Sequence, residues 1–426
     1  MKGTVAVIGG GVAGIVSAWE LSKAGWAVTL FEKETRVGGH THTVVVEDGP
    51  DAGTPVDTGF IVLNEKTYPG LHRFLAELGV AWRWSEMSFG YHDEASGLQY
   101  AGTTLSGLFA QRGNLMSPSF WSLLSDIRRF GLVASTELDT GGLDGLTLGA
   151  YLRARGFSRA FSEHYAAPMG AAIWSTGLSE MMDFPAPTFA RFFKNHGLLS
   201  LADRPRWQTV VGGSHAYVKA FLARFPGRVE RGSGVASLRR LAAGGVEVRA
   251  HGREPERFDR AVVACHADEA LALLADPSDA ERRVLGAWRY LANRTVLHTD
   301  ESFLPPNPRA EAAWNYRRER GEDGTSGVSV TYDMNRLQGL RCERRYLVTL
   351  NPRREPRPGT IIRDLDYKHP AYGFSSIASQ AELPSLSGAR DTWFAGSYHG
   401  YGFHEDAVQS ALAVARRFVL KSVEVI

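Results

Sequence analysis

Apolar residues gather in three short blocks at the start of the chain. Residues 5–8 form an apolar run that ends in three glycines, which predicts a buried parallel strand. Residues 12–23 carry apolar side chains at the helical spacing, and Gly25 follows as a helix stop. A second apolar run, residues 27–31, ends at Glu32. The pattern predicts a strand–helix–strand unit of a parallel sheet.

The pattern changes further along the chain. Aromatic residues and methionines are dense over residues 68–208, where several segments have helical spacing. A Gly-Gly pair at 212–213 then precedes another helical segment, and strand-like apolar runs follow over residues 229–238, 245–250 and 258–265. These runs return to the pattern of the first block, so we assign them to the same domain.

The last part of the chain completes the domain prediction. Residues 268–375 have mixed character, and the proline, arginine and glycine in residues 305–327 predict a loop. Residues 392–418 predict a strand, a glycine-rich turn and a helix. We predict an α/β fold with a Rossmann-type nucleotide-binding domain, residues 1–67, 209–267 and 376–426, and an inserted mixed α+β substrate domain, residues 68–208 and 268–375.

Composition narrows the classes of protein that the chain can belong to. The chain has 426 residues and a formal net charge of +2, which is too weakly basic to predict nucleic-acid binding. Its two cysteines, Cys265 and Cys342, exclude a disulfide framework and a CxxC metal site. No uncharged apolar stretch approaches the ~18 residues that span a bilayer, and no signal peptide is recognisable. We therefore expect a cytoplasmic protein without a metal centre.

Glycines separate the first predicted strand from the first predicted helix in the spacing G-x-G-x-x-G. The first glycine permits the tight turn, the second lets the backbone approach a pyrophosphate, and the third lets the helix pack on the sheet. The helix N-terminus favours phosphate, and an acidic residue after the second strand can bind ribose hydroxyls. A glycine turn without a ligand would not need all these parts together. The predicted cofactor contacts are Gly9, Gly11, Val12, Ala13, Gly14 and Glu32.

The residues after Glu32, E-K-E-T-R-V-G-G-H-T, resemble the E-x-x-x-R-x-G-G-[RK] extension of the flavin amine oxidase and phytoene desaturase superfamily. The resemblance implies non-covalent FAD and an amine-oxidase-like FAD domain. An arginine can neutralise phosphate here, and two glycines let the chain pass close to the cofactor. A histidine stands where many relatives have a basic residue. The stretch adds Lys33, Arg36, Gly38, Gly39, His40 and Thr41 to the predicted contacts.

Three later segments also resemble this superfamily. Residues 57–60 are similar to a turn near the flavin ring, and the run that begins at 229 is similar to adenine-side strands. Residues 392–408 look like the closing motif, in which a helix N-terminus stabilises negative charge on reduced flavin. Ser397 replaces the usual acidic residue of that motif. The contacts that the resemblance implies are Thr58, Gly59, Phe60, Val235, Gly396, Ser397, Phe403, His404 and Ala407.

The chain shows one recognisable dinucleotide motif, so we expect electrons to enter from the substrate and to leave to oxygen, a quinone or a protein. Residues 402–406, G-F-H-E-D, resemble a group of bacterial predicted NAD/FAD-binding proteins linked to modified fatty acids, including the furan fatty acid pathway desaturase. This resemblance implies an FAD-dependent oxidoreductase that takes a hydride from an apolar substrate, a fatty-acyl chain. His404 and Glu405 are the candidate general acid–base residues, or else they only hold flavin or cap the helix.

Three other functions stay open. Phe403 matches one aromatic of an amine oxidase cage, with Lys368 as the candidate lysine near the flavin. A redox-neutral double-bond isomerase and a non-catalytic flavoprotein subunit also fit the motifs. The oligomeric state is not predicted.

Two apolar segments bear on the substrate and on membranes. Residues 118–133 and 188–199 combine aromatic stripes with arginine or lysine, as do helices that lie on anionic membranes and admit phospholipid acyl chains. A helix packed on the protein's own core has the same pattern, and we favour that interpretation. Peripheral membrane contact is the alternative.

Overall fold

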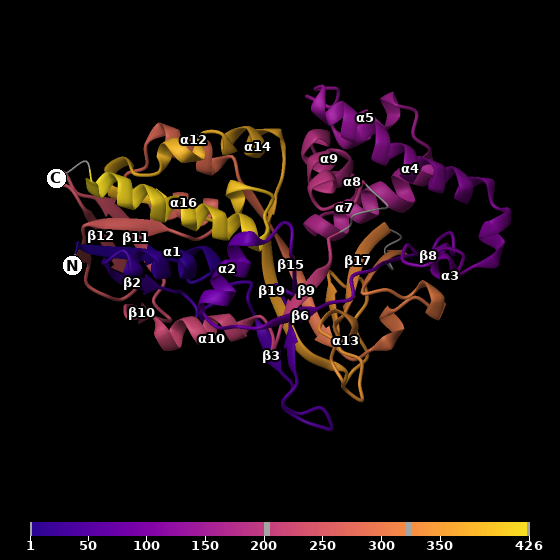
Figure 1. Ribbon diagram of the computed structural model, residues 1–426, viewed down its shortest axis with the longest axis horizontal. Helices are drawn as coiled ribbons and strands as arrows, with labels where there is room; N and C mark the ends of the chain where they lie inside the picture. The colour runs from indigo at the N-terminus through magenta and orange to yellow at the C-terminus, as the bar shows by residue number, and fades with distance from the viewer. Residues whose placement is uncertain (1, 200–204, 321–325, 424–426) are drawn as a thin grey trace.

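The computed structural model describes residues 2–199, 205–320 and 326–423, and it has two lobes (Figure 1). Both ends of the chain lie at the outer end of the first lobe. This lobe is built on a five-stranded parallel sheet in the order β10-β2-β1-β14-β20. Ile8 pairs with Phe31 on one side and Val263 on the other, so the strands end at one common edge. The strands are β1 (Thr4–Ile8), β2 (Ala27–Phe31), β10 (Arg228–Glu230), β14 (Arg260–Val263) and β20 (Thr392–Phe394).

Side chains of β1 alternate between two apolar clusters, as the strand period requires. Val5 and Val7 face four helices, and Ala6 and Ile8 face a small antiparallel sheet with further helices. The first group is α1 (Val12–Lys23), α2 (Pro69–Glu77), α10 (His215–Arg224) and α16 (His404–Val423). The second is β11 (Val235–Arg240), β12 (Val246–Ala250), β13 (Glu256–Phe258), α11 (Ala267–Leu273), α12 (Asp279–Gly286) and α15 (Leu383–Leu386), with α14 (Phe374–Gln380) packed on α12 and α15.

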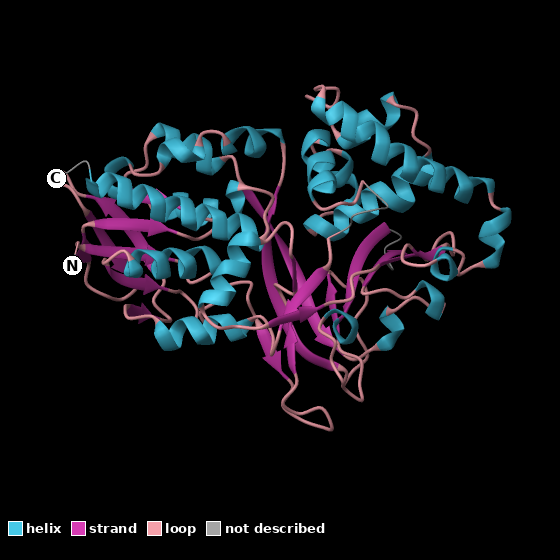
Figure 2. Ribbon diagram, in the orientation of Figure 1, coloured by secondary structure: helices cyan, strands magenta, loops and turns pink. Residues whose placement is uncertain are grey.

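The second lobe places a helical bundle beside a seven-stranded sheet in the order β19-β15-β18-β17-β16-β7-β8 (Figure 2). Its core is strongly aromatic, with Tyr91, Phe130, Phe189 and Tyr316 fully buried. The strands are β7 (Phe89–Asp93), β8 (Gln99–Ala101), β15 (Arg289–His298), β16 (Trp314–Arg320), β17 (Ser326–Asp333), β18 (Leu347–Leu350) and β19 (Ile361–Ala371). The helices are α3 (Leu105–Leu108), α4 (Pro118–Asp139), α5 (Leu148–Ala154), α6 (Arg159–Phe161), α7 (Ala167–Trp174), α8 (Leu178–Met182), α9 (Ala186–Asn195) and α13 (Met334–Leu337).

Short strands and one buried carboxylate connect the lobes. The strands β5 (Val62–Asn64) and β6 (Trp82–Trp84) both pair with β9 (Trp207–Val210), and β3 (Thr43–Val45) pairs with β4 (Pro55–Asp57). Asp57 accepts hydrogen bonds from the Ser214 backbone and hydroxyl in the first lobe. The Gln338 amide, which follows α13 in the second lobe, donates to the other carboxylate oxygen at 3.1 Å. Both lobes thus share a hydrogen-bonded core.

The α/β class and the N-terminal strand–helix–strand unit are confirmed, with bounds that differ from the prediction only at Thr4, where β1 begins one residue earlier. The loop expected over residues 305–327 is wrong in part, because β16 and the first residues of β17 lie there. Arg317 and Glu319 made the segment look solvated, but both are buried, and Arg317 pairs with Glu94. Residues 321–325 of that segment lie outside the described residues.

The structure also moves the predicted domain borders. Helix α2 packs on α16 in the first lobe, and α11 and α12 lie in the apolar cluster on the other face of the parallel sheet. The borders that we set at residues 68 and 268 therefore fall too early, because helices from both predicted substrate segments cover the nucleotide-binding sheet. Among the described helices, none combines the length and hydropathy that crossing a membrane requires.

Candidate active site

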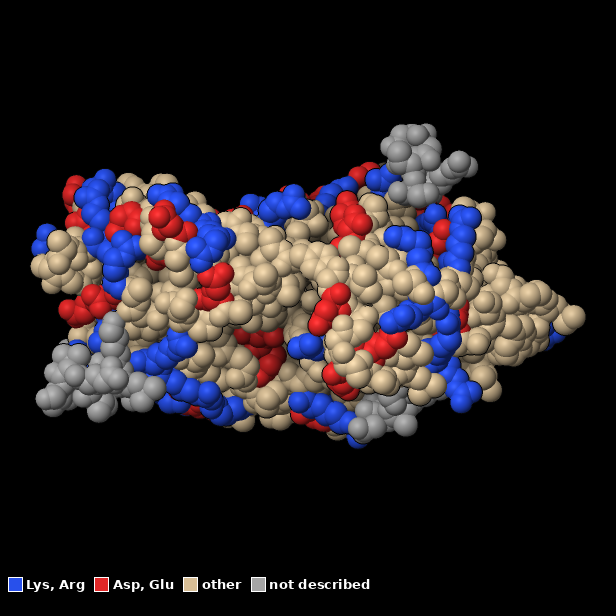
Figure 3. Space-filling model, turned by 90° about the horizontal axis from the view of Figure 1, so that it is seen from above, with Lys and Arg blue, Asp and Glu red and all other residues tan. Residues whose placement is uncertain are grey.

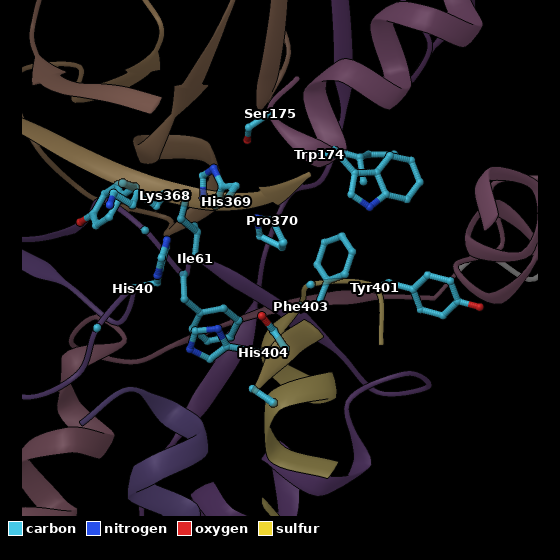
Figure 4. Close-up of a pocket in the computed structure, with 18 of the residues that line it drawn as sticks. His40, Ile61, Trp174, Ser175, Lys368, His369, Pro370, Tyr401, Phe403 and His404 are labelled. Atoms are coloured by element: carbon cyan, nitrogen blue, oxygen red, sulfur yellow. The ribbon is translucent and has the colours of Figure 1, made fainter. Parts of the chain in front are cut away.

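A single continuous cavity of about 1740 Å³ runs from the edge of the parallel sheet into the second lobe. Its first part, the nucleotide half, is lined by the glycine turn after β1, the end of β2 and the turn after β20. Its second part, the substrate half, is lined by some of the described residues in the range 61–207 and by strands of the seven-stranded sheet. The close-up in Figure 4 shows the region where the halves meet, with His40 and His369 on one side and Trp174 and Phe403 on the other.

The three motif glycines have three different surroundings. Gly9 has φ +106°, and a Cβ there would lie 2.7 Å from the Ala264 carbonyl oxygen. A Cβ on Gly14 would lie 1.8 Å from the Gly9 carbonyl oxygen, so this position closes the helix onto the turn. A Cβ on Gly11 would meet no atom within 4 Å, and Gly11 lines the cavity with Val12 and Ala13. The turn is therefore open on the side where a pyrophosphate would pass, and Gly14 itself does not line the cavity.

Glu32 lies at the end of β2 on the wall of the nucleotide half. Its carboxylate accepts hydrogen bonds from the backbone N–H groups of Gly10 (2.8 Å) and Glu34 (2.9 Å). Burial raises the pKa of this carboxyl, and the two hydrogen bonds partly offset that increase. Lys33 also lines the cavity, and its ammonium pairs with Glu269 at 2.8 Å. Val235 lines the same half from the start of β11.

Arg36 shapes the loop that follows Glu32. Its guanidinium donates to the carbonyl oxygens of Thr41 (2.8 Å) and Gly39 (2.9 Å). Gly38 and Gly39 have φ values of +134° and +57°, which favour glycine. A Cβ on Gly39 would lie 3.2 Å from the Gly11 Cα atom, so this loop and the glycine turn meet. Arg36 and both glycines line the cavity, whereas Thr41 does not.

Neutral histidines surround the junction between the halves. His40 is buried, its pKa lies well below the usual value because of burial and nearby histidines, and its Nε2 has no hydrogen-bond partner among the described residues. Its ring lies 5.2 Å from that of His369 and 5.0 Å from that of Tyr367. Asn293 donates to His369 Nδ1 at 3.0 Å, which assigns the proton of this neutral imidazole to Nε2. Both histidines line the cavity.

His404 begins α16 and lines the cavity, where the closing motif placed it. Its Nε2 lies 3.0 Å from the Thr41 hydroxyl and 3.3 Å from the Tyr217 hydroxyl. Burial lowers the pKa of His404 to about 3. The expected base with a near-neutral pKa is therefore corrected: His404 is a neutral ring held by two hydroxyl groups.

Glu405 does not line the cavity. Its two carboxylate oxygens accept hydrogen bonds from the backbone N–H groups of Gly70 (2.8 Å) and Leu71 (2.9 Å), at the start of α2. The expected acid–base role is corrected, because this carboxylate joins two helix N-termini instead of facing a substrate. The sequence left helix capping open as the other role for Glu405. The helix that Glu405 caps is α2 rather than α16.

The other predicted contacts lie around the same junction. The Thr58 hydroxyl bonds to that of Tyr367 at 2.8 Å, and a Cβ on Gly59 would lie 2.1 Å from the His40 carbonyl oxygen. Phe403 stacks on Phe192 of α9, with ring centroids 4.9 Å apart. The residues that line the cavity here are Thr58, Gly59, Phe60, Gly396, Ser397, Phe403 and Ala407.

Some lining residues were not among the predicted contacts. Ala264, Cys265 and His266 follow β14, whose carboxyl end reaches the same edge as those of β1 and β2. The parallel pattern could have predicted them, since ligands bind at this edge. Trp174 ends α7 and is followed by Ser175 in the left-handed conformation, φ 52°. No sequence periodicity distinguishes Trp174 from a core aromatic.

The substrate half is apolar and aromatic. Among the described lining residues in the range 61–207, Arg128 is the one charged side chain and none is a carboxylate, whereas β19 adds Asp366 and Lys368, both exposed. Characteristic members are Ile61, Met87, Tyr100, Leu124, Ile127, Ile173, Trp174, Phe192 and Trp207. Burial lowers the pKa of His196, on the same wall, to about 4.

The nucleotide half fits an FAD molecule. The open space at Gly11 admits a pyrophosphate, Glu32 and Val235 lie on the walls of this half, and the buried Nε2 of His40 has no hydrogen-bond partner among the described residues. A cavity that is continuous with the substrate half also lets a flavin ring reach a substrate.

Comparisons with known proteins agree with this geometry. Residues 12–419 match the family described as flavin containing amine oxidoreductase. The FAD-dependent oxidoreductase pigF of Monascus ruber is 46% identical over 55 residues, which are 13% of this chain and 11% of that protein. The chain therefore spans a small part of this curated relative.

Two solved structures resemble the chain along nearly all of its length. Wild-type putrescine oxidase bound to putrescine has a TM-score of 0.72, and a conjugated-linoleic-acid-producing fatty acid isomerase from P. acnes has one of 0.68. Each is 15% identical to this chain, over 98% of this chain and 99% of the other. The fold, the cavity and the family match agree, and the chain belongs to the flavin-containing amine oxidoreductase family as an FAD-dependent oxidoreductase.

Proposed function

We propose that this enzyme dehydrogenates an apolar substrate, a fatty-acyl chain. The observation that carries the proposal is the lining of the substrate half, where the described residues in the range 61–207 include no carboxylate and the one that β19 adds, Asp366, is exposed. Buried apolar surface binds methylene groups at about 0.8 kcal/mol each, so a long chain gains affinity along such a cavity. A fold shared with both an amine oxidase and a fatty acid isomerase does not favour either substrate, whereas the apolar cavity wall supports the acyl chain.

An ammonium substrate would be poorly served by this wall. A buried charge requires a buried partner of opposite sign, but Arg128 is itself cationic and Asp366 of β19 is exposed. Of the described residues that line the cavity, the two lysines are Lys33 and Lys368. Lys33 is paired with Glu269, and Lys368 is exposed on β19. These features favour the acyl-chain substrate over amine oxidation.

Dehydrogenation removes a hydride from one carbon of the chain and a proton from its neighbour, which forms a carbon–carbon double bond. Bound FAD supplies the hydride acceptor, and oxygen, a quinone or a protein takes the two electrons onward. The chain's own residues exclude water through the aromatic wall and hold the acyl chain in an extended path. His40 and His369 line the junction as neutral rings, and reduction of bound FAD consumes the released proton, so the reaction balances without a charged histidine.

Anaerobic titration of the purified holoenzyme tests this proposal. Acyl lipids and then amines are added, and the visible absorbance of oxidised flavin is followed. Bleaching by an unsaturated acyl lipid with formation of a further double bond supports the proposal. Bleaching by an amine, with no response to lipids, contradicts it.

The fatty acid isomerase neighbour motivates a second readout. An isomerase moves a double bond without a net change of oxidation state, so it completes turnover without an external acceptor. Product analysis under anaerobic conditions, with enzyme far below substrate, separates the two reactions. An isomer that has the substrate's own mass and forms over many turnovers per enzyme would contradict dehydrogenation and support isomerisation.

A further inference from the structure

Exposed apolar side chains gather at the outer end of the second lobe. Of the eleven large hydrophobic residues that are exposed in the described chain, five lie between residues 105 and 132. Figure 1 places this region, α3 with the start of α4, at the end of the molecule opposite the termini, and the projecting end is almost entirely uncharged in Figure 3. We name as the apolar tip Leu105 (76% exposed), Leu115 (48%), Met116 (86%), Trp121 (50%) and Leu132 (66%).

The apolar tip is an ordered surface. The Trp121 indole N–H donates to the Leu115 carbonyl oxygen at 2.9 Å, and its ring lies 5.7 Å from that of Phe109. Trp121, Arg128 and Leu132 are spaced by seven and four residues on α4, which places them on one face of the helix. The prediction that this segment packs on the protein's own core is confirmed for Phe120, Leu123 and Phe130, which are buried. The face of the helix that carries Trp121 and Leu132 is exposed.

The exposed charged residues of the segment that forms the tip have one sign. Residues 102–135 contain Arg112, Arg128 and Arg129, and their one acidic residue, Asp126, is buried and accepts from the Ser158 N–H at 2.7 Å. Arg112 and Arg128 are exposed and form no ion pair within the part of the chain that the structure describes. An apolar surface rimmed by unpaired arginines is complementary to a bilayer with anionic headgroups.

The cavity opens at this tip. Its lining includes Gly102 and Thr103 just before α3 and Leu124, Arg128 and Leu132 on α4. Leu132 and Arg128 therefore belong to both the exposed tip and the wall of the substrate half. An acyl chain that leaves a bilayer beneath the tip would enter the substrate half without crossing water.

We propose that the apolar tip docks on the surface of an anionic phospholipid bilayer, from which the cavity takes an acyl chain. The supply of substrate by this route rests on the proposed function, whereas docking itself does not. A second copy of the chain is a poorer occupant, because a twofold contact would place Arg112 and Arg128 of both copies together. Tryptophan at the rim suits the headgroup region of a bilayer.

Vesicle flotation of the holoenzyme tests docking without requiring turnover. The probes are vesicles of equal parts phosphatidylcholine and phosphatidylglycerol, and vesicles of phosphatidylcholine alone. We expect binding to the anionic vesicles that weakens with added NaCl. The triple variant Leu105→Ser, Met116→Ser, Trp121→Ser should bind at least roughly tenfold more weakly. Arg112→Gln should weaken binding by roughly fivefold.

The matched control replaces three exposed apolar residues elsewhere, Val45→Ser, Ile361→Ser and Phe374→Ser, and should bind as the wild type does. Leu105, Met116 and Trp121 do not line the cavity, so the triple variant should keep its flavin and its reduction by detergent-dispersed acyl substrate. Wild-type protein that does not float with anionic vesicles overturns docking. So does a triple variant that floats equally well, or a concentration-dependent dimer that the triple variant abolishes. Docking without any reduction by lipid leaves docking in place and removes the proposed function.

Discussion

The ring of His404 lies flat on the ring of Phe60, with centroids 3.7 Å apart and planes 11° apart. Phe60 follows the strand β4, and His404 begins the last helix, more than three hundred residues later. The stack joins an early and a late segment of the chain at the place where the two halves of the cavity meet. The stack also fixes the position of the His404 ring, and this role does not require the ring to gain or lose a proton.

Replacement of Gly11 by valine should abolish flavin binding and leave the fold intact. A Cβ at this position meets no protein atom within 4 Å, so the obstruction falls on the pyrophosphate. The measurement is flavin content per protein together with the thermal unfolding midpoint of the apoprotein. Gly14→Ala is the matched control, because its Cβ would lie 1.8 Å from the Gly9 carbonyl oxygen and should destabilise the fold. Full flavin occupancy in Gly11→Val would remove the pyrophosphate assignment.

His404→Phe should keep FAD and slow flavin reduction by on the order of tenfold to 10²-fold, because misplacement of groups near the reacting atoms has effects of this size. The phenyl ring preserves the stack on Phe60 and removes the nitrogen near Thr41 and Tyr217. Stopped-flow reduction measures the change. An unchanged rate would show that the nitrogen has no part in positioning.

The pH dependence of reduction checks the same residue independently. With its pKa at about 3, His404 is neutral throughout the neutral range, so it should contribute no step to the profile there. A wild-type step between about pH 5 and 8 that disappears in His404→Phe would contradict this assignment and restore a base with an ordinary histidine pKa.

Glu405→Ala should destabilise the protein by about 2 kcal/mol, because it leaves two buried backbone N–H groups without acceptors. Chemical denaturation of the holoenzyme and apoenzyme measures the loss. Glu405→Gln keeps one acceptor oxygen and should recover part of the stability. A large loss of activity without any loss of stability would instead support a catalytic role for Glu405.

Asp57 should make folding stability fall with rising pH. Burial raises the pKa of its carboxyl to about 7, above the ordinary value of 3.8, so the folded state holds a proton that the unfolded state releases. The stabilisation is complete below the ordinary pKa and is lost as the pH rises through the folded pKa. The unfolding free energy of the wild type, relative to Asp57→Asn, should therefore fall between about pH 4 and pH 7. Parallel pH profiles of both proteins would contradict this.

Local patterns were sufficient for the nucleotide-binding half. The G-x-G-x-x-G turn, the extension through Arg36 to Gly39 and the closing motif at residues 396–404 are each short and contiguous. Their backbone conformations depend on glycines within the motif, so the sequence predicted residues that the fold brings to one cavity. The same reasoning missed β16, because buried ion pairs gave a core strand the composition of a loop.

The FAD-binding elements, the strand–helix–strand unit and the residues at the glycine turn could be predicted from the sequence, because they depend on contacts between near neighbours in the chain. The state of the candidate chemical groups became visible in the folded structure alone. Burial makes His404 a neutral ring, the N-terminus of α2 donates to both carboxylate oxygens of Glu405, and segments distant in sequence bring His40 beside His369. Desolvation and hydrogen bonding set these properties, and both depend on neighbours that no local pattern specifies.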